Sequence, residues 1–334
     1  MPLSEFPRVE LCHRMTPIEL MPRLTEALGG PKLWVKRDDC TGLAGGGNKT
    51  RKLEFLVAEA LEQGADTLVT QGAVQSNHVR QTAAAACKVG LRCAVLLERR
   101  VPERREDYEV TGNVLLDALF GAEVEFRPPD LDMNAEAVAF GEKLQAEGRK
   151  PYVIPGGGSN TTGAIGYAGC ALEIAQQSRE MDVKFDWVVH ATGSTGTQAG
   201  LVAGFAMPSA APVIPVLGIS VRQPRAKQEA AVHKLADATA RRLGVAAGVS
   251  EDSVHANSDY VGVGYGIPTA GTIDAIKMLA QLEGLLLDPV YSAKGMDGFI
   301  NLIRDGYFSE AKNLLFIHTG GAQVLPAYDQ ELSA

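Results

Sequence analysis

The sequence predicts an α/β protein built on two parallel sheets, and three observations lead to this fold class. Strand-like apolar runs alternate with segments of helical periodicity over most of the 334 residues, which is the rhythm of βαβ units. The runs are too many for one sheet, and the chain is long enough for two moderate domains. No repeat, low-complexity tract or long linker divides the chain, so an arrangement in which one domain interrupts the other fits the pattern.

The predicted elements follow one another in order. Helices are indicated over 53–61, 79–89 and 273–280, where apolar residues recur on one face. Strands are predicted at 33–35, 67–70, 93–97, 123–126, 152–154, 187–189, 213–219 and 314–317. Ligands of parallel α/β folds bind beyond the carboxyl ends of the strands, so the loops after these strands are where we expect a site.

Composition and charge exclude several classes of function. The net charge of −8 gives no electrostatic case for nucleic acid, and the densest charge run, 98–107, is interpreted as a solvated connecting loop. No run is apolar and long enough for a membrane span, and the six scattered histidines lack metal-ligand spacing. The odd count of five cysteines without a CxxC pair, and a start without secretory features, lead us to expect a cytoplasmic protein.

A glycine-rich segment at 45–52 places two lysines at the start of a predicted helix. Asn48 is suited to cap that helix, and Lys49 and Lys52 share one face of its first turn. Two cations at a helix N-terminus oppose the helix dipole, and an anionic ligand would relieve this cost. For the lysines alone, a solvated basic turn is the alternative interpretation.

Three further polar, glycine-rich segments follow predicted strands. At 72–78, Ser76 and Asn77 lie beside free backbone N–H groups that suit a carboxylate, although plain helix capping is an equal alternative. Segments 156–163 and 192–200 are loops of Gly, Ser and Thr that can wrap a phosphate without any charged side chain. Together, the four segments describe a reactive lysine, a phosphate cradle and a carboxylate site.

Several ordered motifs resemble one family of enzymes. The motifs lie at 36–39, 46–54, 75–78, 264–268, 288–291 and 318–321 and run across nearly the whole chain. They closely resemble the D-cysteine desulfhydrase and aminocyclopropane-carboxylate deaminase family of pyridoxal-phosphate enzymes. Within this family, segments 154–160, 190–194 and 259–262 are most similar to the L-cysteate sulfo-lyase branch.

The resemblance implies a fold and an assembly. It implies the tryptophan-synthase-β-like architecture, which is fold type II of pyridoxal-phosphate enzymes. The large cofactor-binding domain would comprise 1–53 and 162–334, and the small α/β domain would comprise 54–161. A homodimer that acts on a small amino acid is expected.

The resemblance also implies residue roles. Lys49 is similar to the Schiff-base lysine, Lys52 to a phosphate partner, and Asn48 to the neighbour of the cofactor's phenolic oxygen. The phosphate loop corresponds to Ser194, Thr195, Gly196 and Thr197, and the substrate carboxylate site to Ser76, Asn77 and His78. Tyr265 and Tyr291 would line the pocket near the reacting atoms, with Ser76 also close to them. Without the flanking motifs, two satisfied core or interface tyrosines would be the simpler interpretation of this pair.

Two departures from the family pattern bear on the chemistry. The deaminase branch has Glu after the tyrosine of its Asp-Pro-Val-Tyr motif, where this chain has Ser292. The partner of the pyridine nitrogen then resembles the hydroxyl of the desulfhydrase branch, here Thr319, which gives a weaker electron sink. Elimination is therefore favoured over cyclopropane cleavage. Gly45 replaces a Phe that is common in the desulfhydrase branch, and we expect it to leave room for a bulkier substituent.

The expected reaction is β-elimination, with freed Lys49 as the base at Cα. L-cysteate would give pyruvate, sulfite and ammonia; the alternative is D-cysteine, giving pyruvate, hydrogen sulfide and ammonia. Aminocyclopropane-carboxylate deamination is less favoured. A racemase or dehydratase, or a binding protein that has lost catalysis, are further alternatives. Arg222 follows a predicted strand and is the candidate for a sulfonate, unless it only begins an exposed helix with Arg225 and Lys227.

Overall fold

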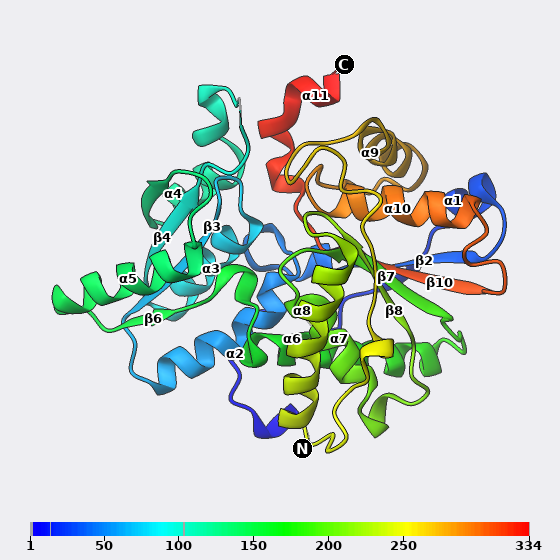
Figure 1. The fold of residues 1–334 in the computed structure, drawn as a ribbon, viewed down its shortest axis with the longest axis horizontal. Coiled ribbons are helices and arrows are strands. Elements are labelled where there is room, and N and C mark those ends of the chain that lie inside the picture. Colours follow the sequence, from blue (N-terminus) through cyan, green and yellow to red (C-terminus); the bar gives the residue numbers. More distant parts are fainter. Residues whose placement is uncertain (1–2, 14, 103, 334) are drawn as a thin grey trace.

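The computed structural model describes residues 3–13, 15–102 and 104–333, and its strands form two sheets that lie in two lobes side by side (Figure 1). In the smaller sheet the strand order is β5-β4-β3-β6 and every pairing is parallel. Its strands are β3 (Thr67–Ala73), β4 (Arg92–Glu98), β5 (Glu123–Arg127) and β6 (Pro151–Val153).

The larger sheet has the order β1-β2-β10-β7-β8-β9. All its pairings are parallel except that of β1, which runs antiparallel to β2 at the edge of the sheet. The strands are β1 (Ile18–Leu20), β2 (Lys32–Lys36), β7 (Trp187–Thr192), β8 (Val216–Ser220), β9 (His255–Asn257) and β10 (Asn313–Ile317). The predicted fold class of two parallel-sheet α/β units is confirmed.

Helices cover both faces of each sheet because the strands are apolar on both sides. On the larger sheet, one buried cluster joins the strands to α1, α9 and α10, and another joins them to α6, α7 and α8. On the smaller sheet, α2 and α3 pack on one face and α5 on the other. The helices are α1 (Pro22–Leu28), α2 (Lys49–Glu62), α3 (Asn77–Val89), α4 (Gly112–Leu119), α5 (Met133–Ala146), α6 (Thr161–Glu180), α7 (Gly196–Phe205), α8 (Arg225–Arg242), α9 (Ala270–Glu283), α10 (Ser292–Arg304) and α11 (Asp329–Ser333).

The order of the strands along the chain shows how the two lobes are connected. Strands of the smaller sheet lie between Thr67 and Val153, and strands of the larger sheet lie before and after that segment. Helix α2 runs from the larger sheet toward the smaller one (Figure 1) and packs against both α3 and α6. The domain limits at residues 53 and 161 stay a prediction.

Within the described ranges, none of the helices combines the length and apolar character that crossing a membrane requires.

Candidate active site

A cavity of about 350 Å³ opens between the two lobes. The cavity lies beyond the carboxyl ends of strands from both sheets, where α/β folds place their ligands. Its lining includes Gly72 and Ala73 at the end of β3, Ala191 and Thr192 at the end of β7, and Thr319 shortly after β10. It contains the predicted site residues Asn48, Lys49, Ser76, Asn77, His78, Ser194, Thr195, Thr197, Arg222, Tyr265, Tyr291 and Thr319.

Two predicted site residues, Lys52 and Gly196, lie just behind the lining. Lys52 is fully buried and its Nζ donates to the Gly157 carbonyl at 3.0 Å. The backbone N–H of Gly196 donates to Ser159 Oγ at 3.2 Å. A Cβ atom on Gly196 would lie 3.0 Å from Lys52 Nζ, so this lysine stands directly against the start of α7. The predicted residues are thus brought together around one cavity, and the role of each stays a prediction.

Lys49 is the first residue of α2 and its Nζ lies 3.4 Å from Ser194 Oγ. Burial lowers the pKa of Lys49 to about 8, while a hydrogen bond with Lys52 acts in the opposite direction. Burial, together with repulsion from Lys49, also lowers the pKa of Lys52 well below its usual value. Among the described residues, no Asp or Glu lines the cavity. Two amines so placed favour an anionic ligand.

Asn48 does not cap α2 as predicted. Its backbone is already helical, and its Nδ2 donates instead to Thr197 Oγ1 at 3.0 Å. The backbone N–H of Asn48 donates to the Thr319 carbonyl at 3.0 Å. The side chain therefore ties the start of α2 to the first turn of α7, a long-range contact that overrides the local capping preference.

The expectation that Gly45 leaves room for a larger substrate is wrong. Gly45 does not line the cavity, and its Cβ position lies 2.4 Å from Nε2 of Gln323, which donates to the Gly45 carbonyl. Gly46 next to it is required for a different reason, because a Cβ there would lie 1.8 Å from the carbonyl oxygen of Asp39. The glycines allow the loop before Lys49 to pack closely against its neighbours.

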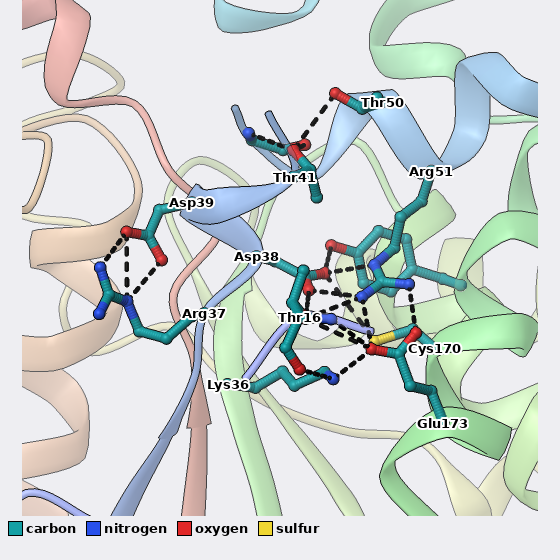
Figure 2. A network of polar contacts seen from close by, with 12 residues as sticks. Thr16, Lys36, Arg37, Asp38, Asp39, Thr41, Thr50, Arg51, Cys170 and Glu173 are labelled. Carbon is teal, nitrogen blue, oxygen red and sulfur yellow. Dashed lines mark hydrogen bonds and ion pairs between the residues drawn. The ribbon is translucent and has the colours of Figure 1, made fainter. Parts of the chain in front are cut away.

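A buried ionic network anchors the first turn of α2 to neighbouring segments (Figure 2). Arg51 donates to Asp38 and to Glu173 on α6, and Lys36 at the end of β2 also pairs with Glu173. Burial of the Asp38 carboxyl would raise its pKa, but the charge and hydrogen bonds of Arg51 outweigh this effect and lower the pKa to about 2. None of these network residues lines the cavity, and Arg51, two residues after Lys49, points to another face of α2, so the network anchors the helix turn that carries Lys49.

The loop before α7 has the geometry of an anion cradle. Thr195 adopts φ 62°, an uncommon backbone conformation for a β-branched residue. In the described part of the chain, the backbone N–H groups of Thr197 and Gln198 have no hydrogen-bond partner. Unpaired N–H groups at the positive end of a helix, together with the Lys52 amine, suit a phosphate. These residues fit the phosphate of pyridoxal phosphate, and the half-buried Lys49 amine, which lines the cavity, fits its aldehyde.

The N-terminus of α3 offers a second anion position. Ser76 caps the helix by accepting the N–H of Val79, and the N–H groups of Asn77 and His78 are unpaired in the described ranges. Thr70 Oγ1 donates to the Ile154 carbonyl, so it accepts the Nε2–H of His78 at 2.8 Å. The other ring nitrogen, Nδ1, is then an unpartnered acceptor that cannot donate to a carboxylate. His78 is expected to contact a carboxylate through its backbone N–H.

Tyr265 and Tyr291 form a hydrogen-bonded pair on one side of the cavity, with hydroxyl oxygens 2.6 Å apart. Burial raises the pKa of both phenols, so both stay protonated near neutral pH. Asp288 orders this segment because its carboxylate accepts the backbone N–H groups of Val290, Tyr291 and Ser292. The Ser292 hydroxyl also donates to Asp288 and does not line the cavity.

The charge run 98–107 is not simply a solvated loop, which corrects the prediction. Arg99 and Arg105 are exposed, but the Arg100 side chain is only 19% exposed and lines the cavity. Arg104 turns inward as well, donating to the Gly266 carbonyl and lying over the Tyr328 ring. Glu103, which belongs to the same run, lies outside the described residues. Arg100 was missed although it stands just after β4, the same kind of position that singled out Arg222.

Comparisons with known proteins show what the chain resembles in sequence and in fold. A family model described as "Pyridoxal-phosphate dependent enzyme" matches residues 9–320. Proteins named D-cysteine desulfhydrase from Salmonella newport and Salmonella heidelberg are 47% identical over 326 residues, which is 98% of this chain and 97% of theirs. A similar solved structure is that of an ACC deaminase homologue, where ACC stands for aminocyclopropane-carboxylate. It superposes with a TM-score of 0.88 and is 38% identical in sequence, and the match covers 99% of this chain and 97% of that one.

A more distant solved structure shares the fold alone. It is a hydrogen sulfide-producing enzyme from Fusobacterium nucleatum, with a TM-score of 0.65 at 14% identity over 93% of this chain and 96% of that one.

Proposed function

The chain belongs to the pyridoxal-phosphate dependent enzyme family, as a lyase of the D-cysteine desulfhydrase and ACC deaminase group, and we propose that it eliminates sulfite from L-cysteate. The products are pyruvate, sulfite and ammonia. The observation that carries this proposal is Arg222, which lines the cavity and whose guanidinium group has no partner among the described residues. A sulfonate needs a cation or several donors, and Arg222 supplies both.

The cofactor-binding part of the proposal rests on the two lysines and the start of α7. Lys52 and the free N–H groups of α7 would hold the phosphate, with the hydroxyls of Ser194 and Thr197 beside it. Lys49 would hold the aldehyde carbon, and Asn48 would lie by the ring. When bound, pyridoxal phosphate supplies an electron sink for the charge that develops at Cα when its proton leaves.

Lys49 is proposed as the base that removes the Cα proton. A base must be neutral when it acts, and an ordinary lysine is almost fully protonated at neutral pH. Because burial brings the pKa of Lys49 to about 8, a useful fraction of its amine is neutral near physiological pH. Its Nζ lines the cavity beside Ser194 Oγ, where a bound substrate can reach it.

The substrate carboxylate is proposed to bind at the N-terminus of α3. The N–H groups of Asn77 and His78 point along the positive end of this helix, and the Ser76 hydroxyl lies beside them. The N-terminus of α3 would then hold the substrate carboxylate, while the N-terminus of α7 holds the cofactor phosphate. The side chain of the substrate would extend toward the tyrosine pair.

Tyr265 and Tyr291 are proposed to hold a proton near the leaving group. In a hydrogen-bonded pair one hydroxyl donates to the other, so one hydroxyl proton remains available to the cavity. The raised pKa of each phenol keeps that proton in place until a basic oxygen or sulfur approaches.

We also expect a homodimer in the cytoplasm, and light scattering on the purified holoenzyme tests the dimer.

The lining of the cavity favours elimination over cyclopropane cleavage. Thr319 lines the cavity, whereas the Ser292 hydroxyl is occupied by Asp288. No carboxylate is among the described lining residues, so the ring nitrogen would have a hydroxyl partner rather than an acidic one. This gives a weaker electron sink, which is sufficient for loss of a good leaving group.

The second candidate substrate is D-cysteine, which the 47% identity to proteins named D-cysteine desulfhydrase favours. A panel of L-cysteate, D-cysteine, L-cysteine and aminocyclopropane-carboxylate, with detection of sulfite, sulfide and keto acids, separates the candidates. Sulfite and pyruvate in equal amounts from L-cysteate are expected. Sulfide from D-cysteine without sulfite from L-cysteate would replace the first proposal by the second, and 2-oxobutyrate would indicate the deaminase reaction.

A further inference from the structure

We propose that Arg100 forms, together with Arg222, a third anion-binding position in the cavity, which selects amino acids with an anionic group on the β-carbon. This inference rests on the proposed function, because it concerns the side chain of the same substrate. Arg100 stands at the end of the smaller sheet and Arg222 at the end of the larger one, and both line the cavity. The two arginines thus approach one ligand from the two lobes.

Arg100 is held in a fixed orientation. Its Nε donates to Glu98 Oε2 at 2.7 Å, and its Nη2 contacts the same oxygen. Its guanidinium carbon lies 5.1 Å from the centre of the Tyr265 ring, an arrangement typical of a cation–π contact. Glu98 is buried and its other carboxylate oxygen accepts the N–H of Asp130. Arg100 therefore cannot swing away freely, and its Nη1 has no hydrogen-bond partner among the described residues.

Arg222 lines the same cavity from the larger sheet, and its side chain is exposed. It directly follows the buried residue Val221, which packs against Gly193. A Cβ on Gly193 would lie 3.2 Å from Val221 and 3.4 Å from the Tyr291 ring, so these residues are in close contact. The charge of Arg222 also acts on Tyr265. Arg100 therefore lies over Tyr265, and Arg222 lines the same cavity and acts on Tyr265 through its charge, on the side of the cavity where the leaving group is expected.

This position is distinct from the two other anion positions. The phosphate position is formed by α7 and Lys52, and the carboxylate position by α3. Neither position uses Arg100 or Arg222 in the contacts described. Glu98 offsets one of the two guanidinium charges, which leaves about one net positive charge near the tyrosines. A single sulfonate or carboxylate on the β-carbon balances that charge, whereas a thiol would leave it uncompensated.

The test measures binding of an unreactive ligand to the holoenzyme. 3-Sulfopropanoate carries the carboxylate and sulfonate of cysteate but lacks the amino group, so it cannot react with the cofactor. Titration calorimetry gives its Kd for the wild type, Arg100→Met and Arg99→Met. Arg99 is the matched control, because it neighbours Arg100 but is half exposed and paired with Glu109 outside the cavity.

We expect the Kd for 3-sulfopropanoate to rise about tenfold or more in Arg100→Met, the size typical of a lost charge-assisted hydrogen bond. It should stay within about twofold in Arg99→Met. Arg100→Lys should restore part of the affinity, which separates a charge effect from misfolding. Propanoate, which has no second anion, should bind equally to the wild type and Arg100→Met. Equal binding of 3-sulfopropanoate to these two proteins would overturn the proposal.

Succinate tests whether the third anion position prefers a sulfonate or a carboxylate. It replaces the sulfonate of 3-sulfopropanoate by a carboxylate, and we expect weaker binding to the wild type. Tighter binding of succinate that still depends on Arg100 would keep the third anion position and reject cysteate as the substrate. The wild type could release sulfite from L-cysteate while Arg100→Met binds 3-sulfopropanoate as tightly as the wild type. That outcome would keep the proposed function and reject this inference.

Discussion

The Lys49 amine and the Ser194 hydroxyl lie 3.4 Å apart, joining the start of α2 to the loop before α7. Gly157 lies against both groups. It has a φ of +68°, and a Cβ atom there would lie 2.2 Å from Ser194 Oγ and 3.4 Å from Lys49 Nζ. Three glycine-rich segments, which the sequence suggested separately, therefore meet at one point of the cavity.

Gly157→Ala is expected to disturb this meeting point. The new methyl group must displace Ser194, and we expect cofactor affinity to fall by about tenfold or more. Gly148→Ala is the matched control, because Gly148 also has a positive φ, +87°, but nothing lies within 4 Å of its Cβ position. Titration of each cofactor-free variant by visible absorption measures the affinity. Equal affinities of the two variants would show that only backbone strain matters.

Lys52→Met is expected to weaken cofactor binding by about tenfold or more, because it removes the amine beside the start of α7 that an adjacent phosphate would keep protonated. Lys143→Met is the control, since Lys143 is 60% exposed on α5. The Kd for pyridoxal phosphate, measured by equilibrium dialysis, reports the effect. An unchanged Kd for pyridoxal phosphate in Lys52→Met would show that Lys52 does not bind the phosphate.

Tyr291→Phe is expected to lower kcat for elimination by about 100-fold or more, the typical contribution of a positioned proton donor. KM should stay within about threefold, because the carboxylate position at α3 is unchanged. Tyr307→Phe, at a 52% exposed position, serves as the control. A variant at Tyr291 with wild-type kcat would reject the proton-holding role of the pair.

Arg222→Ala is expected to reduce turnover of L-cysteate far more than turnover of D-cysteine. The reason is that only the sulfonate requires a cation, and Arg222 has no other partner in the described ranges. Steady-state kcat/KM values for the two substrates give the ratio. Equal losses of kcat/KM for both substrates would show that Arg222 does not bind the sulfonate.

Asp38→Asn is expected to destabilise the protein at neutral pH. The pKa of Asp38 falls from 3.8 to about 2 on folding, which corresponds to roughly 2–3 kcal/mol. Because the folded-state pKa is the lower one, this contribution is complete above pH 3.8 and disappears as the pH falls through about 2. Urea denaturation at several pH values should show the wild type and Asp38→Asn converging in acid. A constant difference at all pH values would contradict the ionised network.

Much of the fold and the site was predictable from sequence because βαβ units have strong local signals. The loops after the predicted strands did supply the residues that line the cavity, as the carboxyl-end rule requires. The strands β1 (IEL) and β9 (HAN) were missed because neither forms an apolar run, whereas the equally short β6 continues its apolar Tyr152-Val153 into Ile154.

The errors concern residues whose surroundings come from distant parts of the chain. Asn48 bonds Thr197 instead of capping its helix, and Gln323 fills the space beside Gly45. Arg100 was hidden in a run of mixed charges, whose exposed members look the same in sequence. Only the folded position, over Tyr265, separates Arg100 from Arg99.

The central claim is that Lys49 carries the cofactor, and borohydride reduction of the holoenzyme tests it most directly. Reduction makes the bond between the lysine and pyridoxal phosphate permanent, and peptide mapping by mass spectrometry then locates it. We expect the added mass on the peptide that contains Lys49, with Nζ of Lys49 as the modified atom. Label on Lys52, or on any lysine other than Lys49, would contradict the account.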